Sequence, residues 1–130
     1  MTEAEIGDSS YPGSVGVMVD LLLTLGTLHD AKYRHFAFKT LEYYSLKLSK
    51  RPTHFPYLFD QAHRYIREDR VIKGSKESLI SSSHKIASVS YPYTFRFATK
   101  DDGFLVCGLN SCFANTPDAD ALDILIKNSF

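Results

Sequence analysis

The chain has 130 residues, of which 44% are hydrophobic and 23% are charged, and its basic and acidic side chains balance to a net charge of zero. These values are typical of one folded domain with a modest core. The balanced charge gives no support for nucleic-acid binding or for a polybasic membrane patch, because both usually show an excess of basic residues.

The longest apolar run, VGVMVDLLLTLGTL, is interrupted by Asp20 and is too short to span a bilayer. The N-terminal stretch MTEAEIGDSS is acidic and polar, which is the opposite of a signal peptide. With no export signal and two cysteines, a disulfide framework is not expected. These features predict a cytoplasmic protein with no nucleic-acid or membrane partner.

We expect Met1–Ser10 to be a disordered lead-in, followed by a helical segment over residues 11–69. Apolar residues recur there at helical spacing in three stretches: Val15–Leu28, Tyr33–Leu48 and Leu58–Ile66. Ser14 and Asp30 are suitable N-caps for the first two helices, which a short connection should pack antiparallel. The first helix is apolar on nearly all sides, and such a helix normally lies inside a larger assembly of helices.

Residues 70–130 show a different pattern, which predicts a small βαββα unit and an α+β fold overall. The expected elements are a strand at Val71-Ile72, a helix capped by Ser75, strands at Tyr93–Ala98 and Phe104–Cys107, and a final helix opened by Thr116-Pro117. Lys100–Gly103 is typical of a hairpin turn, so we expect the last two strands to pair with each other.

Cys107 and Cys112 are the only cysteines, and four residues separate them. This spacing differs from the C-x-x-C of a thioredoxin helix, so it gives no thiol activation by itself. A disulfide closing so small a loop would stabilise the fold by about 2 kcal/mol at most. Two thiolates supply half of a tetrahedral zinc site, and no histidine pair completes one. Structural thiols, a redox pair and part of a metal site therefore all stay open.

No other motif carries a reaction. VIKGSKES resembles an ordinary β-to-α turn, since one glycine is far from a phosphate-binding fingerprint. The carboxylate pairs Asp101-Asp102 and Glu68-Asp69 fall in a predicted turn and a predicted helix end, and the chain has no tryptophan to form a sugar platform. We therefore predict no catalytic residue and no cofactor, and no enzymatic activity for this chain alone.

Two stretches in this order resemble a known family: LLLTLGTLHDAKYRHFAFKTLEYYSLKLSKRPTHFPYLF, and, after the strand RVIKG, FLVCGLNSCFANTPDADAL. They are similar to the C-terminal end of the thioredoxin-domain-containing family that includes spermatogenesis-associated protein 20. Such proteins have a thioredoxin-like domain, then a six-hairpin (α/α) toroid of the glycosidase type, and then a small α/β segment.

The resemblance implies a non-catalytic C-terminal module that completes a toroid, with a link to carbohydrate or thiol-redox metabolism. Cys107 and Cys112 match the family's cysteines, and no catalytic carboxylate carries over. In an intact toroid, neighbouring hairpins would cover the first helix. We therefore expect self-association, or binding of upstream domains, through four residues: Val15, Met18, Leu22 and Leu25. The alternative is a stand-alone redox or metal-binding domain that uses the two cysteines.

Overall fold

The computed structural model describes residues 13–51, 54–100 and 102–130. The fold is α+β, as the sequence predicts. It divides into a helical unit that extends to Arg67 and a sheet unit that begins at Glu68, and each unit has its own hydrophobic core. Glu68 is the one non-glycine residue among those described with a positive φ, 70°. The expected lead-in Met1–Ser10 lies outside the described residues.

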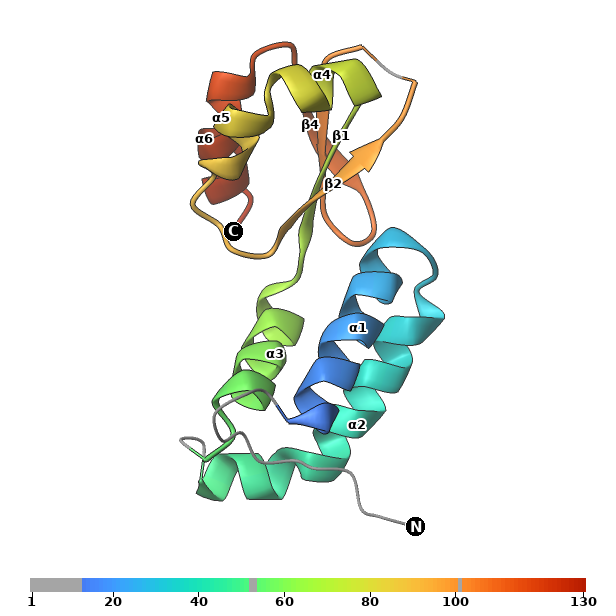
Figure 1. The fold of residues 1–130 in the computed structure, drawn as a ribbon, viewed down its shortest axis with the longest axis vertical. Helices are drawn as coiled ribbons and strands as arrows, with labels where there is room; N and C mark the ends of the chain where they lie inside the picture. Colours follow the sequence, from blue (N-terminus) through green and yellow to red (C-terminus); the bar gives the residue numbers. More distant parts are fainter. Residues whose placement is uncertain (1–12, 52–53, 101) are drawn as a thin grey trace. The chain divides into compact units, whose positions relative to one another are not determined.

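Three helices form the helical unit: α1 (Ser14–Leu28), α2 (Lys32–Lys50) and α3 (Pro56–Arg67) (Figure 1). α1 packs against both α2 and α3, and it runs antiparallel to α2. The core consists of apolar side chains on the facing sides of the three helices: Val15, Val19, Leu23, Ala37, Leu41, Leu48 and Leu58. Burying a set of this size is the main stabilising contribution to the unit.

Neither predicted cap of the helices α1 and α2 is the N-cap itself, and Asp30 immediately precedes Ala31, which occupies the cap position of α2. The Asp30 carboxylate accepts a hydrogen bond from the Lys32 backbone N–H at 3.0 Å, which satisfies one of the unpaired donors at the start of α2. Ser14, in contrast, is the first residue of α1, and Gly13 occupies the cap position without a side-chain bond.

Gly26 allows α1 and α2 to approach closely. A Cβ added at Gly26 would lie 2.8 Å from the backbone nitrogen of Arg34 and 2.9 Å from its Cβ. Because the backbone of α2 cannot yield as a flexible side chain can, this position accepts no side chain without separating the two helices.

The sheet unit contains four strands and several short helices, which cover residues 70–127. The elements are β1 (Arg70–Gly74), α4 (Lys76–Ser81), α5 (Ser83–Ala87), β2 (Thr94–Ala98), β3 (Phe104–Cys107), β4 (Cys112–Thr116), the 3₁₀ turn Ala119–Ala121 and α6 (Leu122–Lys127). The strand order is β2-β1-β3-β4. Ile72 and Val106 are register partners, and they form one core with residues of α4, α5 and α6.

The expected hairpin between β2 and β3 is wrong. β1 lies between these two strands, pairing in parallel with β2 and antiparallel with β3. The chain does turn before β3, since Gly103 adopts a φ of +75°, but the turn leads to the far side of β1. Asp101, in the predicted turn, lies outside the described residues.

The expected start of the final helix also needs correction, because the sequence predicted no strand after Cys107. Thr116 ends the additional strand β4, and its hydroxyl accepts a hydrogen bond from the Asp118 N–H at 3.1 Å. Asp118, not Thr116, caps the following turn by accepting from the Asp120 N–H. The cap predicted for the earlier helix is correct, since Ser75 accepts from the Ser78 N–H at 3.1 Å.

In the described part of the chain, no helix combines the length and the apolar character needed to cross a bilayer.

Candidate functional site

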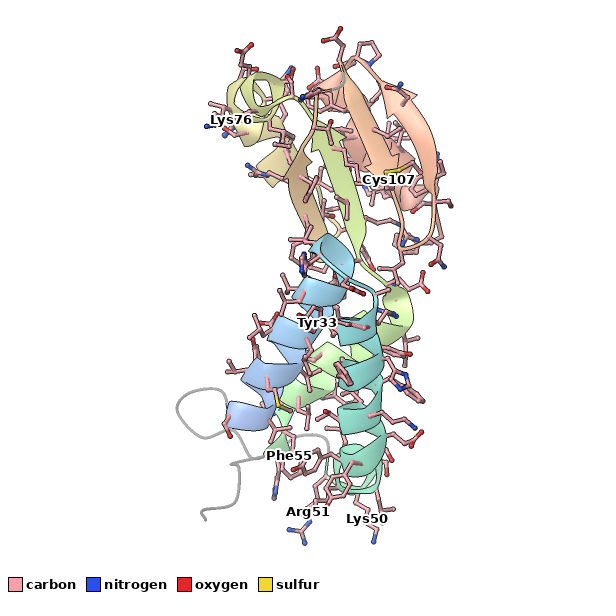
Figure 2. All side chains as sticks on the ribbon, turned by 90° about the vertical axis from the view of Figure 1, so that its right-hand side faces the viewer. Tyr33, Lys50, Arg51, Phe55, Lys76 and Cys107 are labelled. Carbon is pink, nitrogen blue, oxygen red and sulfur yellow. A yellow bond between two sulfur atoms is a disulfide. The ribbon has the colours of Figure 1, made fainter. Side chains whose placement is uncertain are left out.

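Cys107 and Cys112 face each other across the hairpin of β3 and β4 and form a disulfide. Figure 2 shows the bond beside the Cys107 label. The Gly108 N–H donates to the Ser111 carbonyl at 2.9 Å, so the turn between the cysteines closes with its own hydrogen bond. Cys107 is buried, whereas Cys112 is exposed. One cysteine of the disulfide is therefore accessible to solvent and the other is not.

Arg70 connects this hairpin to the end of the chain, a role that the sequence analysis missed. Its guanidinium lies 4.4 Å from the ring centroid of Phe130 and 5.8 Å from that of Phe113, the residue after Cys112. Its Nε also donates to the Ser129 hydroxyl at 2.9 Å. Arg70 is buried, and the cation–π contacts and hydrogen bonds together compensate for the loss of its hydration.

A second network of polar side chains lies in the helical unit, between α1 and α3. Arg64 donates from Nη1 to the Asp20 carboxylate at 2.9 Å and from Nη2 to the Thr24 hydroxyl at 3.2 Å. The Tyr57 hydroxyl donates to the other oxygen of Asp20. The Arg64 side chain is only 4% exposed, and that of Asp20 is 39% exposed. The network thus holds a buried cation against a partly hydrated anion, and it ties α1 to α3.

This network has a consequence at alkaline pH. Burial, together with the hydrogen bond to Asp20 and the negative charge of Asp20, raises the pKa of Tyr57 from 10.0 to about 12. Because the folded state binds this proton more tightly than the unfolded state, the contribution to stability is complete below pH 10. It is expected to disappear as the pH rises from 10 to about 12.

The check is the free energy of unfolding measured by denaturant across that range for wild type and Tyr57→Phe. Wild type should lose more stability than the variant, which has no hydroxyl to titrate at this position. Parallel curves for the two proteins would contradict the prediction.

A groove of about 530 Å³ lies between α2 and α3 in the helical unit. We call it the α2/α3 groove, and its walls are Phe38, Leu41, Glu42, Ser45, Leu48, Ser49, Phe59, Ala62, His63, Tyr65 and Ile66. The stacked rings of Phe38 and Tyr65, with centroids 5.7 Å apart, join its two walls. Apolar side chains dominate, so the groove fits an apolar occupant.

The outer face of α1 is also apolar. Val17, Met18 and Leu21 are exposed, and Leu25 and Leu28 on the same face are half-buried; we call these five residues the α1 ridge. Of the four predicted contact residues, Met18 is on this ridge and exposed, and Leu22 and Leu25 are half-buried. Val15 is wrong as a contact residue, because it is 2% exposed inside the core of the helical unit.

A smaller hollow of about 440 Å³ lies beside α4 and β2, and Lys76 and Arg96 line it. The sequence predicts an ordinary β-to-α turn at the start of α4. The Ser75 side chain caps that helix, and the Arg96 guanidinium donates to the Ser83 carbonyl at 3.4 Å. Both hydrogen bonds stabilise the fold itself, and neither indicates a ligand.

Histidine, cysteine, aspartate and glutamate do not gather in groups of three or more that could hold a metal ion within the described ranges. A zinc site at the two cysteines would need further ligands. Because the sulfur atoms bond to each other, they do not serve as thiolate ligands in this state.

The chain therefore combines a three-helix unit with a mixed four-stranded sheet unit, and its candidate sites are a disulfide-closed hairpin and an apolar groove. We found no matching family model, and neither the curated proteins nor the solved structures gave a significant match.

Proposed function

We propose that this chain is a non-catalytic interaction module whose helical unit forms one layer of a larger array of helices. The sequence resemblance to the end of an (α/α) toroid motivates this proposal. The observation that supports it is the amount of apolar surface on the helical unit. Nine large apolar side chains there are 36–80% exposed: Val17, Met18, Leu21, Phe36, Phe38, Tyr43, Leu46, Phe59 and Ile66.

Together these side chains expose an area on the order of 800 Å², taking about 150–250 Å² for each aromatic side chain and about 100 Å² for each aliphatic one. One partner in a stable protein complex buries a similar area of about 800 Å². Burying it would release on the order of 20 kcal/mol before the costs of association are subtracted. Further copies of this chain, or upstream helical segments, are the partners that this proposal requires.

Light scattering of the purified chain at tens of micromolar tests the proposal. We expect a mass above that of the 14.7 kDa monomer, rising with concentration. A sharp monomer peak that does not change on concentration would count against the interaction module.

A second candidate function is a reversible thiol–disulfide switch at Cys107 and Cys112, in a cytoplasmic setting. The exposure of Cys112 favours it, because exposed disulfides are the labile ones. An external thiolate would attack Sγ of Cys112 and form a mixed disulfide, and Cys107 would leave as a thiolate and take up a proton. A second thiol would then release Cys112, so that a dithiol reductant is oxidised while the protein gains two thiols.

Opening the disulfide should leave the fold intact. The two cysteines close a loop of six residues, for which the entropic stabilisation is about 2 kcal/mol. We expect the Cys107→Ser/Cys112→Ser double variant to lose about 2 kcal/mol of stability and to keep its far-ultraviolet circular dichroism.

Alkylation of the two single variants under native conditions tests the asymmetry of the pair. Cys112 in the Cys107→Ser variant should react quickly with iodoacetamide, and Cys107 in the Cys112→Ser variant should react at least tenfold more slowly (on the order of a 1.4 kcal/mol difference in access). Equal rates in the two matched variants would be evidence against this candidate function.

A further inference from the structure

The helical unit carries two apolar features on different faces, the α1 ridge and the α2/α3 groove. The core residues Val15, Val19 and Leu23 point inward from α1, so the α1 ridge lies on the side of α1 that faces away from that core. The α2/α3 groove lies instead between the other two helices. One surface is convex and the other is concave.

The two features match in length. Along α2 the groove extends from Phe38 to Ser49, which is about 16 Å at 1.5 Å per residue. The ridge extends from Val17 to Leu28, which is also about 16 Å. Apart from the adjacent pair Val17 and Met18, its members are spaced by three or four residues, as the knobs of one helix must be to pack between two others.

The charges do not oppose a contact between the two features. Asp20 is the only charged residue of α1, and Arg64 and Tyr57 of the same chain already engage its carboxylate. The ridge itself therefore carries no charge. Among the groove walls, only Glu42 and His63 are titratable apart from the Tyr65 phenol. Seating the ridge in the groove would bury no charge from the ridge and would need no new ion pair.

Resting on the proposed interaction function, we propose that the α1 ridge of one copy occupies the α2/α3 groove of a second copy. The contact would bury on the order of 200–400 Å² on each side, which is well below the roughly 800 Å² per partner of a standard interface. Association should therefore depend on concentration.

Because the ridge and the groove are different surfaces, the contact is heterologous. In an open assembly the copy at one end keeps an unused ridge and the copy at the other end keeps an unused groove, so growth continues unless a ring closes. Oligomers larger than a dimer should therefore appear as the concentration rises.

Two variants, each with one new charge, disrupt the ridge and the groove separately. Leu21→Glu places a carboxylate on the ridge at a side chain that is 58% exposed, and Ile66→Glu places one at the groove rim, where the side chain is 78% exposed. Neither removes a buried contact of the fold, so both should stay folded. Ile124→Glu is the matched control, since this residue of α6 is 62% exposed and belongs to neither surface.

Sedimentation velocity of each protein, and of an equimolar mixture of the ridge and groove variants, tests the proposal. Wild type and Ile124→Glu should associate, and each of the other two variants alone should be monomeric. The mixture should form a 1:1 dimer that grows no further, because the intact ridge of one variant fits the intact groove of the other.

The outcomes separate two failures. A monomeric wild type would overturn the interaction module itself. A wild type that associates, with a mixture that stays monomeric or with variants that associate like wild type, would leave the module standing and overturn the seating of the ridge in the groove.

Discussion

Replacing Asp20 by alanine is expected to lower the free energy of unfolding of the helical unit by about 3–5 kcal/mol. The reason is that Arg64 would keep its charge in the interior without the carboxylate that now lies 2.9 Å away. Arg64 also donates to Thr24 and Gln61, and neutral acceptors of this kind stabilise a buried charge less than a carboxylate does. The measurement is denaturant unfolding followed through the amide exchange of α1 and α3.

The matched variant is Arg64→Met, which removes the cation and keeps much of the side-chain volume. The anion left behind is 39% exposed and can be hydrated, so the expected loss is smaller, about 1–2 kcal/mol. The double variant should then be more stable than Asp20→Ala alone. If Arg64→Met lowered the free energy of unfolding more than Asp20→Ala, the buried charge of Arg64 would not be what makes the network stabilising.

The second large effect is expected at Ile72, in the centre of the sheet unit. Its side chain is fully buried beside Val106, Leu122 and Ile126. Ile72→Ala should lower the free energy of unfolding of this unit by about 2–5 kcal/mol, because it removes buried methyl groups and leaves a cavity. Amide exchange in β1 and β3 would report the loss.

Ile124→Ala is the control for this prediction, since it makes the same chemical change at an exposed position of α6. Its expected effect is within about 0.5 kcal/mol. Similar losses at the two positions would mean that the core does not lie where the fold places it.

The sequence predicted the helices well because their signal is local. Apolar residues at a spacing of three and four are sufficient to indicate α1, α2 and α3. Ser75 caps α4 as expected, whereas Asp30 bonds to the first residue of α2 from the position before its cap. The sequence predicted one helix where the structure has two, α4 from Lys76 and α5 from Ser83, because a single apolar stripe runs through both.

The sheet was harder to predict because its pairing is not local. Lys100–Gly103 is a good turn sequence, but no local pattern shows that β1, some thirty residues earlier, lies between β2 and β3. The strand β4 was missed since Cys112–Thr116 contains Asn, Thr and mostly exposed side chains, which give little apolar alternation.

In the candidate sites too, the sequence indicated single residues but not their distant partners. The two cysteines were singled out by their rarity, and the hairpin that joins them depends on the unpredicted strand β4. Asp20 seemed only to interrupt an apolar run, because its partner Arg64 lies 44 residues away. Val15 was expected at a surface, since an all-apolar helix does not reveal which of its faces the other helices cover.

The central claim is that the helical unit covers its α1 ridge and its α2/α3 groove by association. Methyl NMR spectra recorded over a dilution series test it most directly. The methyl groups of Leu21 and Ile66 should shift with concentration, and those of Ile72 and Val106 in the sheet core should not. Ridge and groove methyl shifts that stay constant from low to high concentration would contradict the claim.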